Sequence, residues 1–183
     1  LEIYQWLRAV NPNIHLHLHS NGGARTPEFW RGMAKIKVSV TFAIDGLEDT
    51  NHLYRRNVRW SKLIENVRAF IDAGGNAGWA MLIFKHNESQ IEQCRLLSTE
   101  LGFASFKIQQ SARWADFDYI GNWREMEKIP VDGYFLEKSS QMSAPAIGSG
   151  GNSSKINITK NDFATKKINC KSHDIKKNHV EIY

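Results

Sequence analysis

Residues 14–19, Ile-His-Leu-His-Leu-His, decide the fold class, because apolar and polar side chains alternate strictly along them. Alternation with a period of two is typical of a β-strand with one buried face. Residues 2–10 show helical spacing of apolar side chains before this stretch, and the turn Ser20-Asn21-Gly22-Gly23 follows it. A second helix is expected to begin at Thr26-Pro27. The sequence therefore predicts a strand between two helices.

The same alternation of strands and helices continues along the chain. Further strands are expected at residues 37–45, 79–84 and 103–108. Helices are expected at 58–73 and 88–101, with Gly74 and Gly102 at their ends. Strands that alternate with helices indicate right-handed crossovers and a parallel sheet. The run 79–84 is almost wholly apolar, which predicts a strand buried on both faces.

Two of the expected strands each have one polar face. One strand carries three histidines and the other carries Ser, Thr, Ala and Asp: His15, His17, His19, Ser39, Thr41, Ala43 and Asp45. Such faces are too polar to lie beneath helices, and they fit a barrel lumen that holds a ligand. The sequence therefore predicts an α/β fold, a partial (β/α) TIM-like barrel that is incomplete at both ends and has a flexible C-terminal extension. Chemistry in such barrels lies at the carboxyl ends of the strands.

Composition argues against several classes of protein. The net charge is +5, but residues 151–183 carry +4 of it, so the rest of the chain is balanced. This balance argues against a nucleic-acid-binding face. No apolar run approaches the roughly 20 residues of a membrane span, and no signal peptide is visible. The two cysteines, Cys94 and Cys170, do not form a disulfide scaffold, so a cytoplasmic location is expected.

Four short stretches occur in order along the chain. They are His-Ser-Asn-Gly at 19–22, Phe-Ala-Ile-Asp-Gly at 42–46 with Tyr-Arg at 54–55, Phe-Lys-His-Asn at 84–87, and Ile-Asn-Cys at 168–170 with Val-Glu-Ile-Tyr at 180–183. Together they resemble the radical S-adenosylmethionine (radical SAM) superfamily, and within it the proteins with a SPASM-type C-terminal extension. The resemblance covers residues 1–110 well and 165–183 weakly.

The sequence also departs from this family. The CxxxCxxC motif and the later Pro-Cys-Cys are absent, and Ala43 stands where the family often has Ser. We expect the chain to be a fragment that is truncated at both ends. The alternative is a degenerate relative of the family that holds no cluster. A truncated fragment would be inactive alone, because the ligands of the radical cluster would lie outside this chain.

The resemblance implies four segments. Residues 1–113 would be the central part of a radical SAM-like partial barrel, and the aromatic-rich residues 114–137 would connect it to a flexible linker at 138–155. The linker is rich in Ser and Gly. Residues 156–183 would begin a SPASM-like extension.

The resemblance also implies an activity. Radical SAM enzymes use a [4Fe-4S] cluster to cleave SAM and to abstract a substrate hydrogen. A SPASM extension implies a peptide or protein substrate, and the cluster requires an electron donor. The residues that would bind SAM are Asn21, Gly22, Asp45, Arg55 and Asn87. Cys170 would ligate an auxiliary cluster, and no catalytic residue can be named.

Each of these residues also has a purely structural interpretation. Asp45-Gly46 could simply form a turn, and Asn21-Gly22 could be chosen for a left-handed conformation. Arg55 could be a surface residue, and Arg56 could instead be the arginine that contacts the SAM carboxylate. Asn87 is expected to cap the helix 88–101.

Two other functions remain open from the sequence. His15, His17 and His19 lie on alternate positions of one strand, so they could hold zinc for a metal-dependent hydrolase on a (β/α) barrel. The aromatic segment 114–123 and the basic tail are compatible with a non-catalytic module that binds a peptide or RNA.

Overall fold

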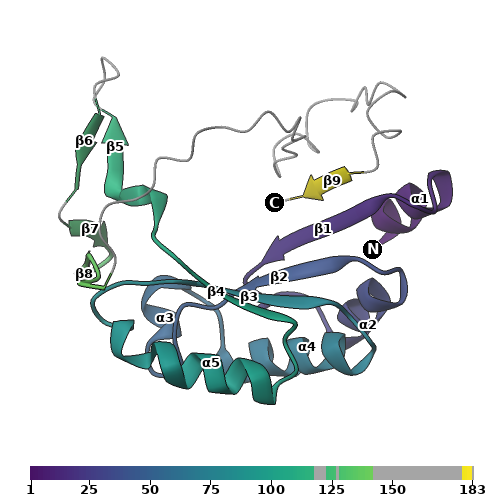
Figure 1. Ribbon diagram of the computed structural model, residues 1–183, viewed down its shortest axis with the longest axis horizontal. Helices are drawn as coiled ribbons and strands as arrows, with labels where there is room; N and C mark the ends of the chain where they lie inside the picture. Colours follow the sequence, from purple (N-terminus) through teal and green to yellow (C-terminus); the bar gives the residue numbers. More distant parts are fainter. Residues whose placement is uncertain (118–122, 127, 142–178, 183) are drawn as a thin grey trace.

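A parallel sheet forms the centre of the protein (Figure 1). The computed structural model describes residues 1–117, 123–126, 128–141 and 179–182. The strands are β1 (His15–Ser20), β2 (Ser39–Ala43), β3 (Ala77–Leu82), β4 (Ser105–Gln109) and β9 (His179–Ile182). They lie in the order β4-β3-β2-β1-β9, and all neighbours are parallel. The predicted α/β class with a parallel sheet is confirmed.

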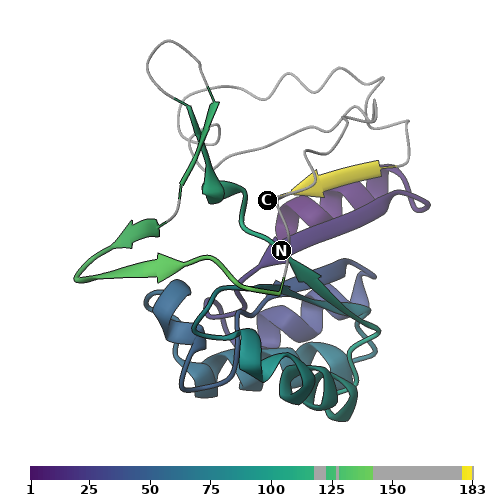
Figure 2. The same cartoon turned by 60° about the vertical axis from the view of Figure 1, so that its left-hand side comes forward.

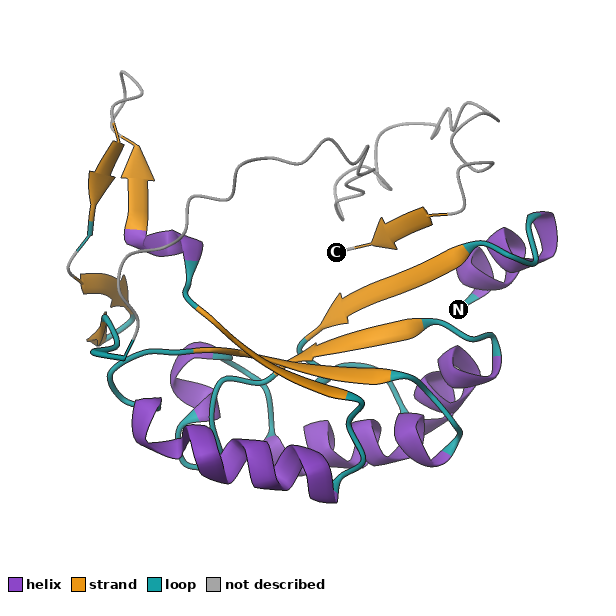
Figure 3. Ribbon diagram, viewed as in Figure 1, coloured by secondary structure: helices purple, strands orange, loops and turns teal. Residues whose placement is uncertain are grey.

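Helices cover one face of this sheet. They are α1 (Glu2–Val10), α2 (Pro27–Lys35), α3 (Asn51–Tyr54), α4 (Trp60–Asp72), η1 (Glu88–Gln90) and α5 (Ile91–Glu100). Figure 3 shows α2, α4 and α5 along the same side of the strands, and none of the described helices forms such a layer on the opposite side. The described strands form one open, curved layer, so the barrel itself stays a prediction. Within the described ranges, no helix combines the length and the hydropathy that a bilayer crossing requires.

The core lies between the sheet and its helices. In β2, Val40 and Phe42 are buried, while the alternate residues Ser39, Thr41 and Ala43 are half-buried. The rings of Phe42, Trp30 of α2 and Phe70 of α4 pack against one another, with centroids 5.1–6.3 Å apart. One face of each strand therefore supplies the core, as the period of two predicts.

The structure corrects the expectation that residues 79–84 form a strand buried on both faces. In β3 the side chains alternate between buried and half-buried positions. Trp79 and Met81 enter the core, whereas Ala80 and Leu82 lie on the face without helices. The apolar run arises because this second face uses small or aliphatic residues, not because helices cover it.

The helix ends follow the predicted signals. The hydroxyl of Thr26 accepts a hydrogen bond from the Phe29 amide of α2 at 3.5 Å, which is an N-cap. Gly74 (φ 81°) and Gly102 (φ 84°) end α4 and α5 in the left-handed conformation.

Beyond β4 the chain forms two small antiparallel hairpins (Figure 2). After η2 (Ala112–Trp114), β5 (Ala115–Phe117) pairs with β6 (Trp123–Glu125), and β7 (Lys128–Val131) pairs with β8 (Tyr134–Glu137). Trp114, Ile129 and Leu136 form a second buried cluster with Phe84, which follows β3. The hairpin β7–β8 is thereby attached beside the carboxyl ends of the strands.

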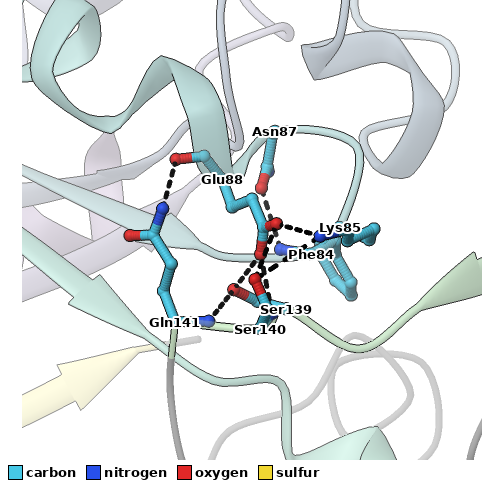
Figure 4. Close-up of polar contacts among 7 residues, drawn as sticks. All are labelled: Phe84, Lys85, Asn87, Glu88, Ser139, Ser140 and Gln141. Carbon is cyan, nitrogen blue, oxygen red and sulfur yellow. Dashed lines mark hydrogen bonds and ion pairs between the residues drawn. The ribbon is translucent and has the colours of Figure 1, made fainter.

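A buried carboxylate completes this attachment (Figure 4). Glu88 is 9% exposed, and it accepts hydrogen bonds from the Ser139 hydroxyl, the Ser140 amide and hydroxyl, and the Lys85 ammonium, at 2.5–2.9 Å. The side-chain amide of Gln141 donates to its backbone oxygen at 3.3 Å. Residues 138–141 of the predicted linker are thus bonded to the body, and the rest of the linker lies outside the described residues.

These contacts predict a pH-dependent stability. Burial alone would raise the pKa of Glu88, but the hydrogen bonds from Lys85, Ser139 and Ser140 lower it from 4.5 to about 2. A lowered pKa stabilises the folded state above pH 4.5, and the contribution disappears as the pH falls toward 2. We expect Glu88→Gln to reduce the free energy of unfolding by about 2–3 kcal/mol at pH 7, and by much less at pH 2 to 3.

Urea denaturation of both forms at the two pH values measures this difference. The control is Glu92→Gln, since Glu92 lies on α5 and its exposed carboxylate pairs with Arg95 at 3.5 Å. That change should cost less than about 0.5 kcal/mol at either pH. Equal stability of wild type and Glu88→Gln at pH 7 would contradict the role given to Glu88.

Candidate functional site

The turn after β1 has a tightly determined conformation. The Ser20 hydroxyl accepts a hydrogen bond from the Gly22 amide, and the Asn21 side-chain oxygen accepts one from the Gly23 amide, both at 3.1 Å. Gly22 has φ 66°, and a Cβ at this position would lie 2.6 Å from a methyl group of Leu63. Glycine is therefore required here by both backbone conformation and space. The side chain of Asn21 is exposed and serves the turn.

Helix α4 holds this turn against the sheet through Asn66, which the sequence analysis did not single out. Its buried side-chain amide donates to the carbonyl oxygens of Gly22 at 2.8 Å and Ala24 at 3.2 Å. Trp30 of α2 donates to the same Ala24 oxygen at 3.1 Å. The available signal was a lone asparagine among the apolar positions of the helix 58–73.

Asp45, just after β2, is fully buried and joins three segments. One carboxylate oxygen accepts a hydrogen bond from the Leu82 amide at the end of β3, at 2.6 Å. The other lies 2.5 Å from the Nε of Arg55. The Asp45 amide donates to the Asn51 side chain of α3 at 2.8 Å. Both carboxylate oxygens are thus engaged within the protein, so Asp45 would act on a ligand through Arg55.

The ionisation of Asp45 reflects two opposing effects. Burial raises the pKa of this carboxyl above its ordinary value, while the Arg55 guanidinium and the Leu82 amide act in the opposite direction. The Arg55 side chain is 23% exposed and is the link between the buried carboxylate and the surface.

Asn87 is also buried, and it connects the same strand ends. Its side-chain oxygen accepts a hydrogen bond from the Phe84 amide at 2.8 Å, and its amide donates to the oxygens of Asp45 at 2.9 Å and Leu82 at 3.0 Å. It precedes η1 but makes no side-chain capping bond there. Asn87 thus stands at the N-cap position of η1, but the expected side-chain cap is wrong, because the side-chain oxygen that would accept the capping bond accepts the Phe84 amide instead.

Arginine side chains and aromatic rings gather beside these strand ends. The Cζ of Arg55 lies 5.1 Å from the ring centroid of Tyr54, and the Cζ of Arg113 lies 6.0 Å from the same centroid. The Tyr54 ring packs on Phe84 at 4.8 Å. Arg56 lies instead over Tyr134, at 5.9 Å. The sequence left open whether Arg55 or Arg56 belongs to the site. Arg55 is the one that forms an ion pair with Asp45.

The histidines of β1 share the helix-free face of the sheet, as their alternation predicts. His15 is exposed, His17 and His19 are half-buried, and the rings of the latter two are 4.8 Å apart. The Nε2 of His17 lies 3.0 Å from the hydroxyl of Thr41 on β2. Among the described residues, no group of three or more His, Cys, Asp or Glu side chains could hold a metal ion. The zinc site of the hydrolase alternative is therefore not formed by these histidines.

The two cysteines give no cluster site in the described part of the chain. Cys94 is fully buried in α5, and its burial, with the charges of Asp49 and Asp45, raises the pKa of the thiol to about 12. It is a core residue that does not supply a thiolate. Cys170, the predicted ligand of an auxiliary cluster, lies outside the described residues.

Comparison with known proteins shows a likeness at the level of the fold. No family model matches the sequence, and no curated protein is similar to it. Two crystal structures of SuiB from Streptococcus suis, one of them bound to S-adenosylmethionine, superpose with a TM-score of 0.53 at 16% identity. The match covers 69% of this chain and 29% of SuiB, so this chain corresponds to less than a third of that protein.

The buried position of Asp45 predicts a large effect of its removal. Asp45→Ala would leave the Leu82 amide and the Arg55 guanidinium without their acceptor inside the protein. We expect a loss of about 2–4 kcal/mol in the free energy of unfolding. Urea denaturation measures this, with Asp49→Ala as the control, because Asp49 is exposed and bonds to Gln90 at the surface. If both variants lose the same small amount of unfolding free energy, Asp45 does not hold these strand ends together.

Proposed function

We propose that this chain is part of a radical SAM enzyme whose SAM lies at the carboxyl ends of β1, β2 and β3. The observation that supports this most is the helix-free polar face of the sheet, which ends at Gly22 and Arg55. The likeness in fold to SuiB, one of whose structures is bound to S-adenosylmethionine, also supports the proposal. Ligands of parallel α/β folds generally bind beyond the carboxyl ends of the strands.

The residues at this edge suit the groups of SAM in different ways. The turn brings the exposed Asn21 side chain to this edge, while the Gly22 amide and carbonyl are bonded to Ser20 and Asn66 and fix the shape of the turn. Arg55 can pair with the carboxylate of the methionine moiety, because its Nε is fixed by Asp45 and its terminal nitrogens remain for another acceptor. Asp45 and Asn87 are positioning residues in this proposal.

The [4Fe-4S] cluster does not fit the described residues, because Cys94 is the one cysteine among them and its thiol is buried. In the whole enzyme such a cluster would supply the redox chemistry for cleavage of SAM and abstraction of a substrate hydrogen. Its ligands would come from outside this chain, as the absent CxxxCxxC motif also implies. Cys170 as a ligand of an auxiliary cluster, a peptide or protein substrate and a separate electron donor are further parts of the proposal.

A steric test separates binding at this edge from binding elsewhere. Ala43 and Ser39 lie on the same helix-free face of β2, at its carboxyl and amino ends respectively. We expect Ala43→Phe to fill the space where SAM would lie and to weaken SAM binding more than tenfold, or about 1.4 kcal/mol. Isothermal titration calorimetry of the chain with SAM measures the affinity.

Ser39→Phe is the matched control, because it adds a phenyl group to the same strand face four residues away. It should leave the affinity for SAM within twofold of wild type. Circular dichroism and urea denaturation establish that both variants fold. Equal affinities for the two variants, or no heat of binding with the wild-type chain, would contradict the proposed location of SAM.

A further inference from the structure

Two guanidinium groups from distant parts of the sequence share one aromatic ring at the carboxyl edge of the sheet. Arg55 follows α3 and Arg113 belongs to η2, and both have their Cζ within 6.0 Å of the Tyr54 ring centroid. The two Cζ atoms are therefore at most about 11 Å apart. Arg113 was not among the residues that the sequence analysis selected.

Two positive charges lie beside this ring. The one ion pair of Arg55 with a described residue is that with Asp45, and it uses Nε alone. The Arg113 side chain is exposed. Two cations held near each other repel, so an anion that binds between them is favoured by both.

The backbones of both arginines are hydrogen-bonded, and the Arg55 side chain is also held. The Arg55 side chain is held at Nε by a carboxylate that is itself bonded to β3. Arg113 precedes the fully buried Trp114, and the Arg113 amide donates to the Ser111 hydroxyl at 3.2 Å. Anchored groups lose less conformational freedom on binding, which increases the affinity that each contact contributes.

The dimensions suit a carboxylate. When two guanidiniums grip one carboxylate with N–O distances of about 2.8 Å, their Cζ atoms lie about 8 Å apart. The upper limit of about 11 Å found here is compatible with this arrangement after a small rotation of the exposed Arg113 side chain. The Tyr54 ring supports both cations through its π face.

We propose that Arg55 and Arg113 form a two-arginine site for a carboxylate of the ligand that binds at this edge. The carboxylate belongs either to the methionine moiety of SAM or to an acidic side chain or C-terminus of a peptide substrate. The site deepens the proposed function by adding a residue from beyond β4 to the binding edge, but the arginine pair itself does not depend on that function.

The experiment compares Arg113→Gln, Arg113→Lys and wild type in calorimetric titrations with three probes. These are SAM, decarboxylated SAM, which lacks the carboxylate, and the peptide acetyl-tetraglutamate amide. Arg113→Gln should weaken one of the carboxylate-bearing probes about fivefold to tenfold, the range expected for one exposed charge-assisted contact. Arg113→Lys should recover part of this loss, since it keeps the charge but not the planar fork. Binding of decarboxylated SAM should not change.

Arg95→Gln is the matched control. The Cζ of Arg95 lies 5.1 Å from the Phe106 ring, so this substitution also removes a half-exposed guanidinium from an aromatic face. It should affect none of the three probes by more than twofold.

The outcomes distinguish the source of the carboxylate. A loss with SAM but not with decarboxylated SAM assigns it to the cofactor, whereas a loss with tetraglutamate alone assigns it to an acidic substrate. If Arg113→Gln binds all probes as the control does, the two-arginine site is overturned, even where wild type binds SAM and the proposed function stands. If wild type binds tetraglutamate through Arg113 but not SAM, the proposed function fails and the site remains. Binding of no probe by wild type overturns both.

Discussion

The buried ion pair between Asp45 and Arg55 is the interaction on which the carboxyl edge of the sheet depends. A carboxylate in the interior is costly unless its oxygens are hydrogen-bonded and its charge is compensated. Here the Leu82 amide meets the first requirement and Arg55 the second, at 2.6 and 2.5 Å. Because these partners come from β3 and from the segment after α3, one carboxylate fixes the relative position of three segments. Removing the Asp45 carboxylate would leave the Arg55 side chain without the contact that orients it.

The one-sided burial of the sheet explains why this edge is open to a ligand. Among the described residues, helices cover one face (Figure 3), and the polar residues of β1 and β2 on the other face are exposed or half-buried. The residues that face outward from β3 are small or aliphatic, such as Ala80, and they add no polar group that needs a partner. The surface beyond Ala43 is thus bordered by backbone turns and by arginines rather than by a second helical layer.

The periodic parts of the fold could be predicted from the sequence, whereas most of the polar contacts at the edge could not. Alternation at residues 14–19 and the signals at Thr26, Gly74 and Gly102 are local, so each is visible in a few consecutive residues. Asn66 and Arg113 act on partners 42–44 and 59 residues away, and no local pattern marks such pairs. Asn87 was selected as a site residue, but its side-chain cap was wrongly predicted, because its side-chain oxygen accepts a hydrogen bond from the Phe84 amide rather than from the next helix.

The two halves of the arginine site are each held by a different buried carboxylate. Asp45 positions Arg55 directly. Glu88 binds Ser139 and Ser140, and the Lys85 amide donates to the Glu137 oxygen of β8 at 2.9 Å, so the hairpin stays packed on Trp114, the neighbour of Arg113. Because burial raises the pKa of Asp45 while hydrogen bonds lower the pKa of Glu88 to about 2, a falling pH would neutralise Asp45 first and weaken the Arg55 half before the Arg113 half. Stability of the hairpin and binding at the edge are therefore physically linked through the backbone between Phe84 and Glu88.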